Sequence, residues 1–262
     1  MIPALCVPIL NRGDLLLRLF NSVDFPIDNF AIIVNALDSG EDPSVTQAIS
    51  TIKNSVDAGH PHIKKLTITP GILLDADLKL VSHNMGVAKS WNYFLNYLDK
   101  APYIIISGND MMFTPGDLKA MHDTAMAANQ DDTAIISSNH GFACFAILKS
   151  AVEKIGLFDE NFYPAYLEDC DYHYRCVLAK MHIHRAATNI VHGEAPTWGS
   201  STIYSNQGAL LKKNQITHGK NYVYYNLKWG APRENAEVYQ YPFNDPKNSV
   251  KYWPTPGKYL VW

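Results

Sequence analysis

Short apolar runs recur along the first half of the chain, and polar or turn-forming residues bound each of them. The strand-like runs are Ala4–Leu10, Phe30–Val34, Lys65–Thr69, Tyr103–Ser107 and Ala134–Ser137. Segments between them carry apolar residues at helical spacing, as in Asp14–Ser22, in Gly86–Asp99 and around Leu118 to Ala125. Strands that alternate with helices imply crossover connections, so the pattern predicts an α/β fold with a mostly parallel sheet flanked by helices.

The pattern changes after about residue 140. Strands are predicted at Gly141–Leu148, His182–Ala186 and Asn189–His192, and helices at Ser150–Ile155, Ala165–Lys180 and Gly208–Tyr225. Beyond Gly193 the chain is rich in aromatic, Asn, Pro and Gly residues, which favours an irregular, aromatic-rich C-terminal extension. We find no repeat and no linker, and therefore predict one domain over 1–262, with parts at about 1–140, 141–195 and 196–262.

Composition and charge argue against some classes of protein. The 262 residues carry a net charge of −3 and no long basic run, which argues against a broad nucleic-acid surface. The apolar N-terminal stretch lacks a basic leader and is interpreted as a first strand, and no run approaches the roughly 20 apolar residues of a membrane span. Four cysteines without paired zinc spacing favour a reduced, cytoplasmic chain.

The candidate chemistry lies where predicted strands end in polar turns. The run Tyr103–Ser107 stops on Gly108-Asn109-Asp110, and Asn11-Arg12 and Asp38-Ser39 follow two other strands. Ligands of open α/β sheets bind at the carboxyl ends of strands, and Mg²⁺ or Mn²⁺ takes oxygen ligands shared with substrate phosphates. The alternative is ordinary turn chemistry, which Asn and Asp also suit.

Several motifs occur in a fixed order along residues 4 to 195. They are Val7-Pro8-Ile9-Leu10-Asn11-Arg12, Asn84-Met85-Gly86-Val87-Ala88 with Asn92, Gly108-Asn109-Asp110, Gly156-Leu157-Phe158-Asp159-Glu160, Glu168-Asp169-Cys170-Asp171 with Arg175, and His192. In this order they resemble the GT-A glycosyltransferases, specifically the family-2-like inverting enzymes that use nucleotide-sugars. The resemblance implies a Rossmann-like GT-A fold and a sugar transferase, with Asp110 as the one carboxylate of the metal turn.

The resemblance also implies roles for particular residues. Asp110 and His192 would hold Mn²⁺ or Mg²⁺, and Asp169 would be the catalytic base. The donor, with a UDP-sugar favoured, would contact Pro8, Asn11, Arg12, Asp38, Asn84, Gly86, Lys89, Asn92, Asn109 and Asp110. The acceptor side would hold Glu168, Asp171 and Trp198.

Each of these residues also has a structural explanation that requires no catalytic or binding role. The acids Glu168, Asp169 and Asp171 suit a solvated first helical turn, and His192 suits a strand end. The C-terminal aromatic residues are interpreted as an acceptor groove or as packing against the sheet. His182 and His184 would share one face of a strand, which an exposed face explains better than a metal site.

Two other functions stay open. One is a non-catalytic module that binds nucleotide-sugars or glycans. The other is a sugar nucleotidyltransferase, although its Gly-rich basic loop is missing after the first strand. For a transferase, the partners would be a nucleotide-sugar and a hydroxyl acceptor in a glycan, a protein, a lipid-linked sugar or a modified nucleic-acid base.

Overall fold

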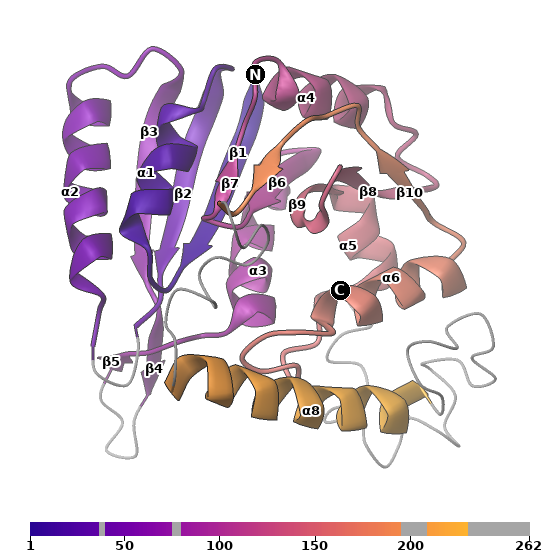
Figure 1. Ribbon diagram of the computed structural model, residues 1–262. Helices are drawn as coiled ribbons and strands as arrows, with labels where there is room; N and C mark the ends of the chain where they lie inside the picture. Colours follow the sequence, from indigo (N-terminus) through magenta and orange to yellow (C-terminus); the bar gives the residue numbers. More distant parts are fainter. Residues whose placement is uncertain (37–39, 75–79, 195–208, 230–262) are drawn as a thin grey trace.

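A seven-stranded sheet runs through the centre of the protein. The computed structural model describes residues 1–36, 40–74, 80–194 and 209–229 (Figure 1). The sheet strands are β1 (Ile2–Ile9), β2 (Ile27–Val34), β3 (Ile63–Pro70), β6 (Tyr103–Ser107), β8 (Thr133–Ser138), β9 (Gly141–Leu148) and β10 (His182–Arg185). Their order is β10-β8-β9-β6-β1-β2-β3, and only β9 runs antiparallel to its neighbours. The predicted mostly parallel α/β fold is confirmed.

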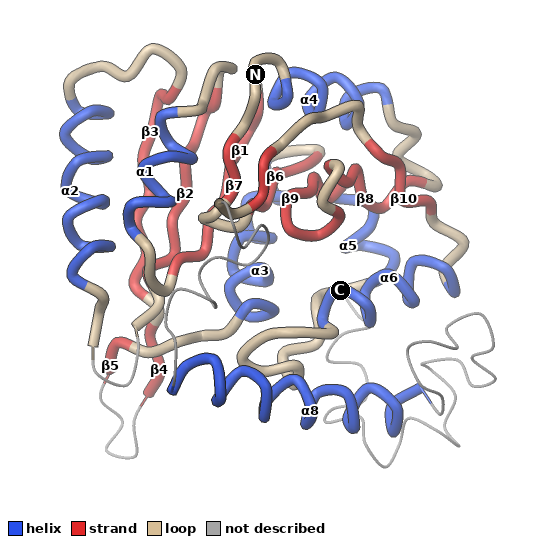
Figure 2. Tube along the Cα trace, viewed as in Figure 1, coloured by secondary structure: helices blue, strands red, loops and turns tan. Residues whose placement is uncertain are grey.

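Helices cover both faces of this sheet (Figure 2). They are α1 (Gly13–Asn21), α2 (Pro43–Asp57), α3 (Val87–Leu95), the 3₁₀ helix η1 (Asn96–Lys100), α4 (Asp117–Ala127), α5 (Lys149–Ile155) and α6 (Glu168–Leu178). Along β1, Leu5, Val7 and Ile9 join one core with α1, α2 and α4. Ala4 and Cys6 point to the other core, with α3, α5 and α6. Burial on both faces explains why these strands are continuously apolar.

Two small ladders and a long helix complete the described chain. The ladders are β4 (Ile72–Leu74) with β5 (Leu80–Ser82), and β7 (Met111–Met112) with β11 (Val191–His192). Helix α8 (Ala209–Trp229) lies along one end of the molecule, below α3 and α6 in Figure 1. No helix in the described ranges is long and apolar enough to cross a membrane.

Several elements differ from their sequence predictions, two helices among them. The pattern missed α2, whose buried stripe is only Val45, Ala48 and Ile52, although Asp42 caps it by accepting from the Ser44 N–H. The helix expected from Ala165 begins at Glu168, because Tyr166 and Leu167 have φ of 82° and 74° and cannot continue a right-handed helix backwards.

Candidate functional site at the carboxyl ends of β1 and β6

The turns that follow β1 and β6 meet at one edge of the sheet. The β1–β6 ladder ends at the pair Cys6 and Ile106, so the two strands part before their turns. There the side-chain amide of Asn109 donates to the backbone carbonyl of Asn11, at 3.1 Å. Chain connections run in opposite directions from β1 and β6, which makes this a switch point of the kind where α/β folds bind ligands. The expected gathering of Asn11, Arg12, Asn109 and Asp110 is what the structure shows.

Asp110 lies at the tip of this edge beside His192. Its carboxylate oxygen Oδ1 is 3.5 Å from the Nε2 atom of His192, and the residue is 5% exposed. The backbone carbonyl of Asp110 accepts hydrogen bonds from the Arg18 guanidinium, at 2.7 Å, and from the Gly193 N–H, at 2.9 Å. The turn after β6 is therefore fixed to α1 and to the end of β11.

His140 is a neighbour that sequence reasoning missed. Its ring meets the His192 ring edge-on, with centroids 5.3 Å apart, and its Nε2 atom is 2.7 Å from the Ile190 carbonyl oxygen. The residue lies in the turn between β8 and β9, more than fifty positions before His192, so no local motif marks it. The described residues contain no group of three or more His, Cys, Asp or Glu side chains placed to hold a metal ion.

Arg12 takes a left-handed backbone conformation, with φ and ψ of 60°, at the start of α1. Its guanidinium forms ion pairs with Asp14, at 2.6 Å, and with Glu194, at 2.7 Å. The hydrogen bond and charge of Asp14 outweigh burial and raise the pKa of Arg12, and the Arg12 hydrogen bond lowers the pKa of Asp14. A phosphate at Arg12 would thus compete with two carboxylates.

The start of α3 is held by protein groups. The N–H groups of Met85, Gly86 and Val87 donate to the Asn35 side chain, the Asn84 side chain and the Pro164 carbonyl, at 2.8, 2.9 and 2.7 Å. These three N–H groups are thus bonded to protein groups, and a phosphate contact at Gly86 stays a prediction.

Close packing and the backbone conformation explain why residue 86 is a glycine. Its φ is 79°, and a Cβ atom there would lie 2.9 Å from Tyr163 and 3.0 Å from the Pro164 carbonyl oxygen. Asn35, whose side chain accepts from the Met85 N–H, directly follows β2 and was given no role from the sequence.

Asn92 links two segments of the chain. Its side-chain NH₂ donates to the Phe158 carbonyl and to the Glu160 carboxylate, at 2.9 and 3.0 Å, and its oxygen accepts from the Phe158 N–H. Asn92 therefore joins α3 to the turn before α6, and a donor contact at this residue stays a prediction. Lys89 is half-buried on the first turn of α3, and Pro8 is half-buried near the end of β1, beyond its last pair with β6.

The acidic residues Glu168, Asp169 and Asp171 lie in the first turn of α6. Glu168 is 5% exposed, and its Oε2 atom has no hydrogen-bond partner among the described residues. Burial, with the nearby charge of Asp169, raises the pKa of its carboxyl well above the usual range. Asp169 is only half-buried, and its Oδ1 atom accepts from the Cys170 N–H at 2.8 Å. The alternative of a fully solvated acidic turn is therefore wrong for Glu168.

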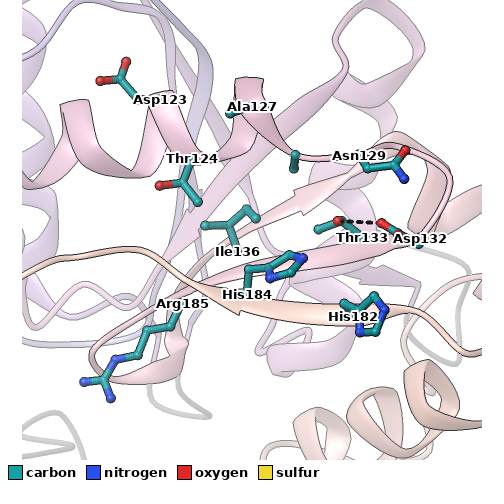
Figure 3. A pocket seen from close by; sticks show the side chains of 11 residues that line it. Asp123, Thr124, Ala127, Asn129, Asp132, Thr133, Ile136, His182, His184 and Arg185 are labelled. Atoms are coloured by element: carbon teal, nitrogen blue, oxygen red, sulfur yellow. Dashed lines mark hydrogen bonds between the residues drawn. The ribbon is translucent and has the colours of Figure 1, made fainter.

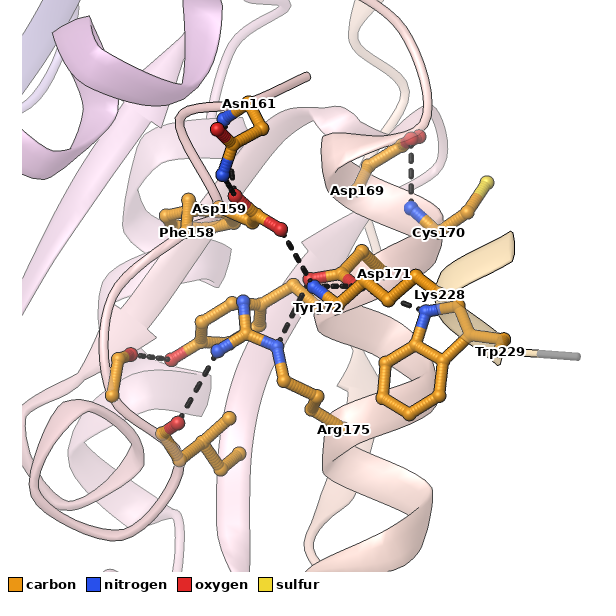
Figure 4. A network of polar contacts seen from close by, with 12 residues as sticks. Phe158, Asp159, Asn161, Asp169, Cys170, Asp171, Tyr172, Arg175, Lys228 and Trp229 are labelled. Atoms are coloured by element: carbon orange, nitrogen blue, oxygen red, sulfur yellow. Dashed lines mark hydrogen bonds and ion pairs between the residues drawn. The ribbon is translucent and has the colours of Figure 1, made fainter. Parts of the chain in front are cut away.

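Asp171 belongs to an internal ion network rather than to an acceptor surface (Figure 4). It is completely buried, and its two oxygens contact Arg175 at 3.0 Å, Lys228 at 2.6 Å and the Trp229 indole N–H at 3.0 Å. This corrects its assignment to the acceptor side, because every one of these contacts is to the protein interior. Asp171 and Arg175, four residues apart, form this ion pair on one face of α6.

Asp159 supplies the second carboxylate of the same ion network. Its carboxylate lies 2.7 Å from the Lys228 ammonium and accepts from the Tyr224 hydroxyl at 2.8 Å. Burial alone would raise the pKa of Asp159, but the charge and hydrogen bond of Lys228 outweigh it and lower the pKa to about 2. Lys228 comes from α8, so a segment close to the C-terminus completes the charge balance around α6.

Four other residues for which the sequence predicted a role are Asp38, Trp198, Tyr225 and Trp229. Asp38 and Trp198 lie outside the described residues. Tyr225 and Trp229 of α8 are buried with Phe162, Leu167 and Tyr174, and this cluster is separate from the two cores of the sheet. These two aromatic residues are therefore packed in the interior, against α6 and the segment before it rather than against the sheet.

A pocket of about 830 Å³ lies elsewhere, toward the amino ends of β8 and β10 (Figure 3). Its lining includes His182 and His184, with ring centroids 5.8 Å apart, together with Arg185 and residues at the end of α4. Since β8 runs parallel to β6, this is the opposite end of the sheet from Asp110. The pocket therefore does not belong to the candidate site.

Asp110 and His192 fit a divalent cation of the Mn²⁺ or Mg²⁺ type. Such ions are commonly held by one or two carboxylates and share their remaining positions with phosphates and water, so a full protein cage is not required. A carboxylate oxygen and an imidazole nitrogen 3.5 Å apart supply two donors that approach a common point. The carboxylate of Asp110 suits both Mg²⁺ and Mn²⁺, whereas imidazole is a common ligand of transition ions.

Comparison with solved structures bears on the fold. The sequence matches no family model and no curated protein. The mannosyltransferase PcManGT from Pyrobaculum calidifontis, in complex with GDP-Man and Mn²⁺, is similar with a TM-score of 0.52 and 15% identity, over 90% of this chain and 74% of that chain. S. aureus TarS has a TM-score of 0.49 and 13% identity, covering 96% of this chain and 48% of that chain, which supports no conclusion. At such identities the likeness concerns the fold alone: this chain shares a GT-A-like fold with that mannosyltransferase.

Proposed function

We propose that the protein is a glycosyltransferase that moves a sugar from a nucleotide-diphosphate sugar to a hydroxyl acceptor. The observation that carries the proposal is the pair Asp110 and His192 at the switch point between β1 and β6. A carboxylate and an imidazole there are placed to share a divalent cation with a diphosphate. The motif order favours an inverting, family-2-like enzyme and a UDP-sugar, while the similar PcManGT structure holds GDP-Man and Mn²⁺.

The chain's own groups have distinct parts in this proposal. Asn11 and Asn109 join the two turns, and the Arg18 and Gly193 contacts hold the Asp110 turn in place. A cation bound at Asp110 and His192 would neutralise charge that develops on the leaving diphosphate. Lys89, half-buried on α3, is the proposed donor-side cation, and Asp38 the proposed contact to the base.

Asp169 is the proposed general base. Transfer to a hydroxyl requires that the attacking oxygen lose its proton, and a carboxylate is a usual acceptor for it. Asp169 keeps part of its surface exposed at the first turn of α6, whereas its neighbours Glu168 and Asp171 are buried. Among the three acids it is the one that an incoming hydroxyl can reach.

Calorimetric titration tests the site directly. Mn²⁺ is titrated together with GDP or UDP into the parent protein, into Asp110→Asn and into His192→Ala, with Asp123→Asn, an exposed carboxylate on α4, as the matched control. We expect both site variants to lose at least about tenfold in metal-dependent nucleotide affinity, and the control to lose none. Equal affinity in Asp110→Asn and the parent would place the cation elsewhere.

Turnover separates an enzyme from a binding module. Hydrolysis of GDP-mannose or UDP-glucose in the presence of Mn²⁺ is followed by release of nucleotide. Release by the parent that disappears in Asp110→Asn supports a transferase. Tight donor binding with no release, across a panel of donors and hydroxyl acceptors, would instead favour the non-catalytic module.

A further inference from the structure

Helix α8 contacts the segment that leads into the acidic turn. The Asn221 side chain donates to the Ala165 carbonyl at 2.8 Å and to the Tyr166 carbonyl at 3.1 Å. Two turns further along α8, Lys228 and Trp229 bond Asp171 on the other side of Glu168 and Asp169. The two acids that precede Cys170 are thus bracketed by contacts to one helix.

The backbone between these contacts is strained. Tyr166 and Leu167 both have positive φ, at 82° and 74°, and neither is glycine. Such conformations are unfavourable for residues other than glycine and persist only where surrounding contacts enforce them. Asn221, at 4% exposed, satisfies two carbonyls within this turn, so it is placed to hold the turn in its strained form.

The start of α6 depends on that turn. Leu167 is the residue that precedes the helix, and it has no side-chain oxygen with which to cap the first turn. Its carbonyl instead accepts the first helical hydrogen bond, from the Asp171 N–H at 2.9 Å. The directions in which Glu168 and Asp169 project therefore follow from the dihedral angles of Tyr166 and Leu167.

We propose that Asn221 is a positioning residue, which holds the Ala165–Leu167 turn and thereby orients Glu168 and Asp169 from outside the catalytic segment. The proposal rests on the proposed function where it concerns turnover, because it assigns Asn221 to the placement of the proposed base. Asn221 does not contact a reacting atom. It acts through the backbone that precedes the acids, and α8 becomes part of the catalytic framework.

The test compares Asn221→Ala with Gln215→Ala, which removes an exposed amide from the same helix. With GDP-mannose or UDP-glucose and Mn²⁺, we expect Asn221→Ala to lower kcat by about tenfold or more while the donor KM changes by less than about threefold. Gln215→Ala should change neither. A loss of kcat without a change in KM separates misplaced acids from weakened donor binding.

A second measurement needs no donor. The Glu168 carboxyl is titrated by carbon NMR in the folded parent and in both variants. Burial and the charges of Asp169 and Asp171 raise the pKa of Glu168, so a turn that relaxes should bring it back toward its ordinary range in Asn221→Ala alone. If the parent turns over no donor, the proposed function fails, and the titration still decides whether Asn221 positions the acid.

Unchanged kcat together with an unchanged Glu168 titration in Asn221→Ala would overturn the proposal. If Asn221→Ala does not fold, the double variant with Tyr166→Gly is used, because glycine adopts positive φ without support. A folded double variant with the parental Glu168 titration and turnover would also overturn it. A folded double variant with a shifted titration or reduced kcat supports it.

Discussion

Three neighbouring acids at the start of α6 have different surroundings, although the sequence presents them as one cluster. Glu168 is buried with an oxygen that lacks a hydrogen-bond partner, Asp169 is partly exposed, and Asp171 is ion-paired in the interior. A buried carboxyl favours its neutral form, while a paired carboxylate remains charged. The residue scale therefore separates a buried carboxyl with a raised pKa, an accessible carboxylate and an ion-paired carboxylate.

Asp169→Asn should abolish most transfer while leaving the donor bound. The amide keeps the size of the side chain and can still accept from the Cys170 N–H, but it cannot take a proton. We expect turnover to fall by about 10²-fold or more, with nucleotide affinity by calorimetry near that of the parent. Near-parental turnover in this variant would remove Asp169 from the role and make Glu168 the next acid to test.

Glu168→Gln should stabilise the protein near neutral pH and have less effect in acid. Because the folded-state pKa is raised, the folded protein retains a proton there that the unfolded chain has lost, so stability falls as pH rises through the unfolded pKa toward the folded one. Glutamine removes that dependence. Each unit of raised pKa corresponds to about 1.4 kcal/mol.

Thermal melting from pH 5 to pH 8 measures this effect, with Glu153→Gln, an exposed acid on α5, as the control. The melting temperature of Glu168→Gln should exceed that of the parent by an amount that grows with pH. A constant difference across this range would mean that the carboxyl does not titrate differently in the folded protein.

At the scale of elements, the start of α3 and the second half of α8 both hold the segment from Phe158 to Asp171. Val87 donates to the Pro164 carbonyl from α3, and Asn221 and Lys228 reach the same segment from α8. Helical propensity explains none of these contacts. They join residues more than fifty positions apart and fix α6 relative to the edge of the sheet.

Gly86→Ala tests the contact on the α3 side. The new Cβ would lie 2.9 Å from Tyr163 in addition to adopting positive φ, so we expect a loss of about 2–4 kcal/mol in the free energy of unfolding. Gly116→Ala shares the positive φ, at 89°, but meets no atom within 4 Å. Chemical denaturation should therefore show a larger loss for Gly86→Ala, and equal losses would attribute the whole effect to backbone strain.

Lys228→Met tests the contact on the α8 side. It leaves the completely buried carboxylates of Asp159 and Asp171 without their shared cation, and removal of one partner from a buried ion pair costs about 3–5 kcal/mol. Lys220→Met, an exposed lysine of the same helix, should change the free energy of unfolding by less than about 0.5 kcal/mol. Equal denaturation midpoints for the two variants would contradict the burial of this network.

At the scale of the whole molecule, two buried carboxyl groups make the free energy of unfolding depend on pH, each in its own pH range. Glu168 favours the folded state when protonated, whereas Asp159 favours it when ionised. The pKa of Asp159 is lowered to about 2, so its contribution is complete above its unfolded pKa and is lost as pH falls through the folded value.

We therefore expect acid unfolding to steepen below about pH 4, where Asp159 takes up a proton only in the unfolded chain. Circular dichroism melts between pH 5 and pH 2 should show a weaker dependence on pH in Asp159→Asn than in the parent. The same slope in both proteins would mean that other carboxylates account for the acid transition.

The order of strands and helices followed from the sequence, because continuous apolar runs and helical spacing are local patterns. The same holds for the polar turns after β1 and β6, which parallel strands bring to one edge. The sequence could not show that α8 supplies Lys228 and Asn221 to the acidic segment, that Asn92 and Gly86 serve packing between elements, or that His140 meets His192. Those contacts form between residues that are distant in the sequence and become neighbours only in the folded protein. Burial and ion pairing then decide the pKa of each acid and its effect on the stability of the fold.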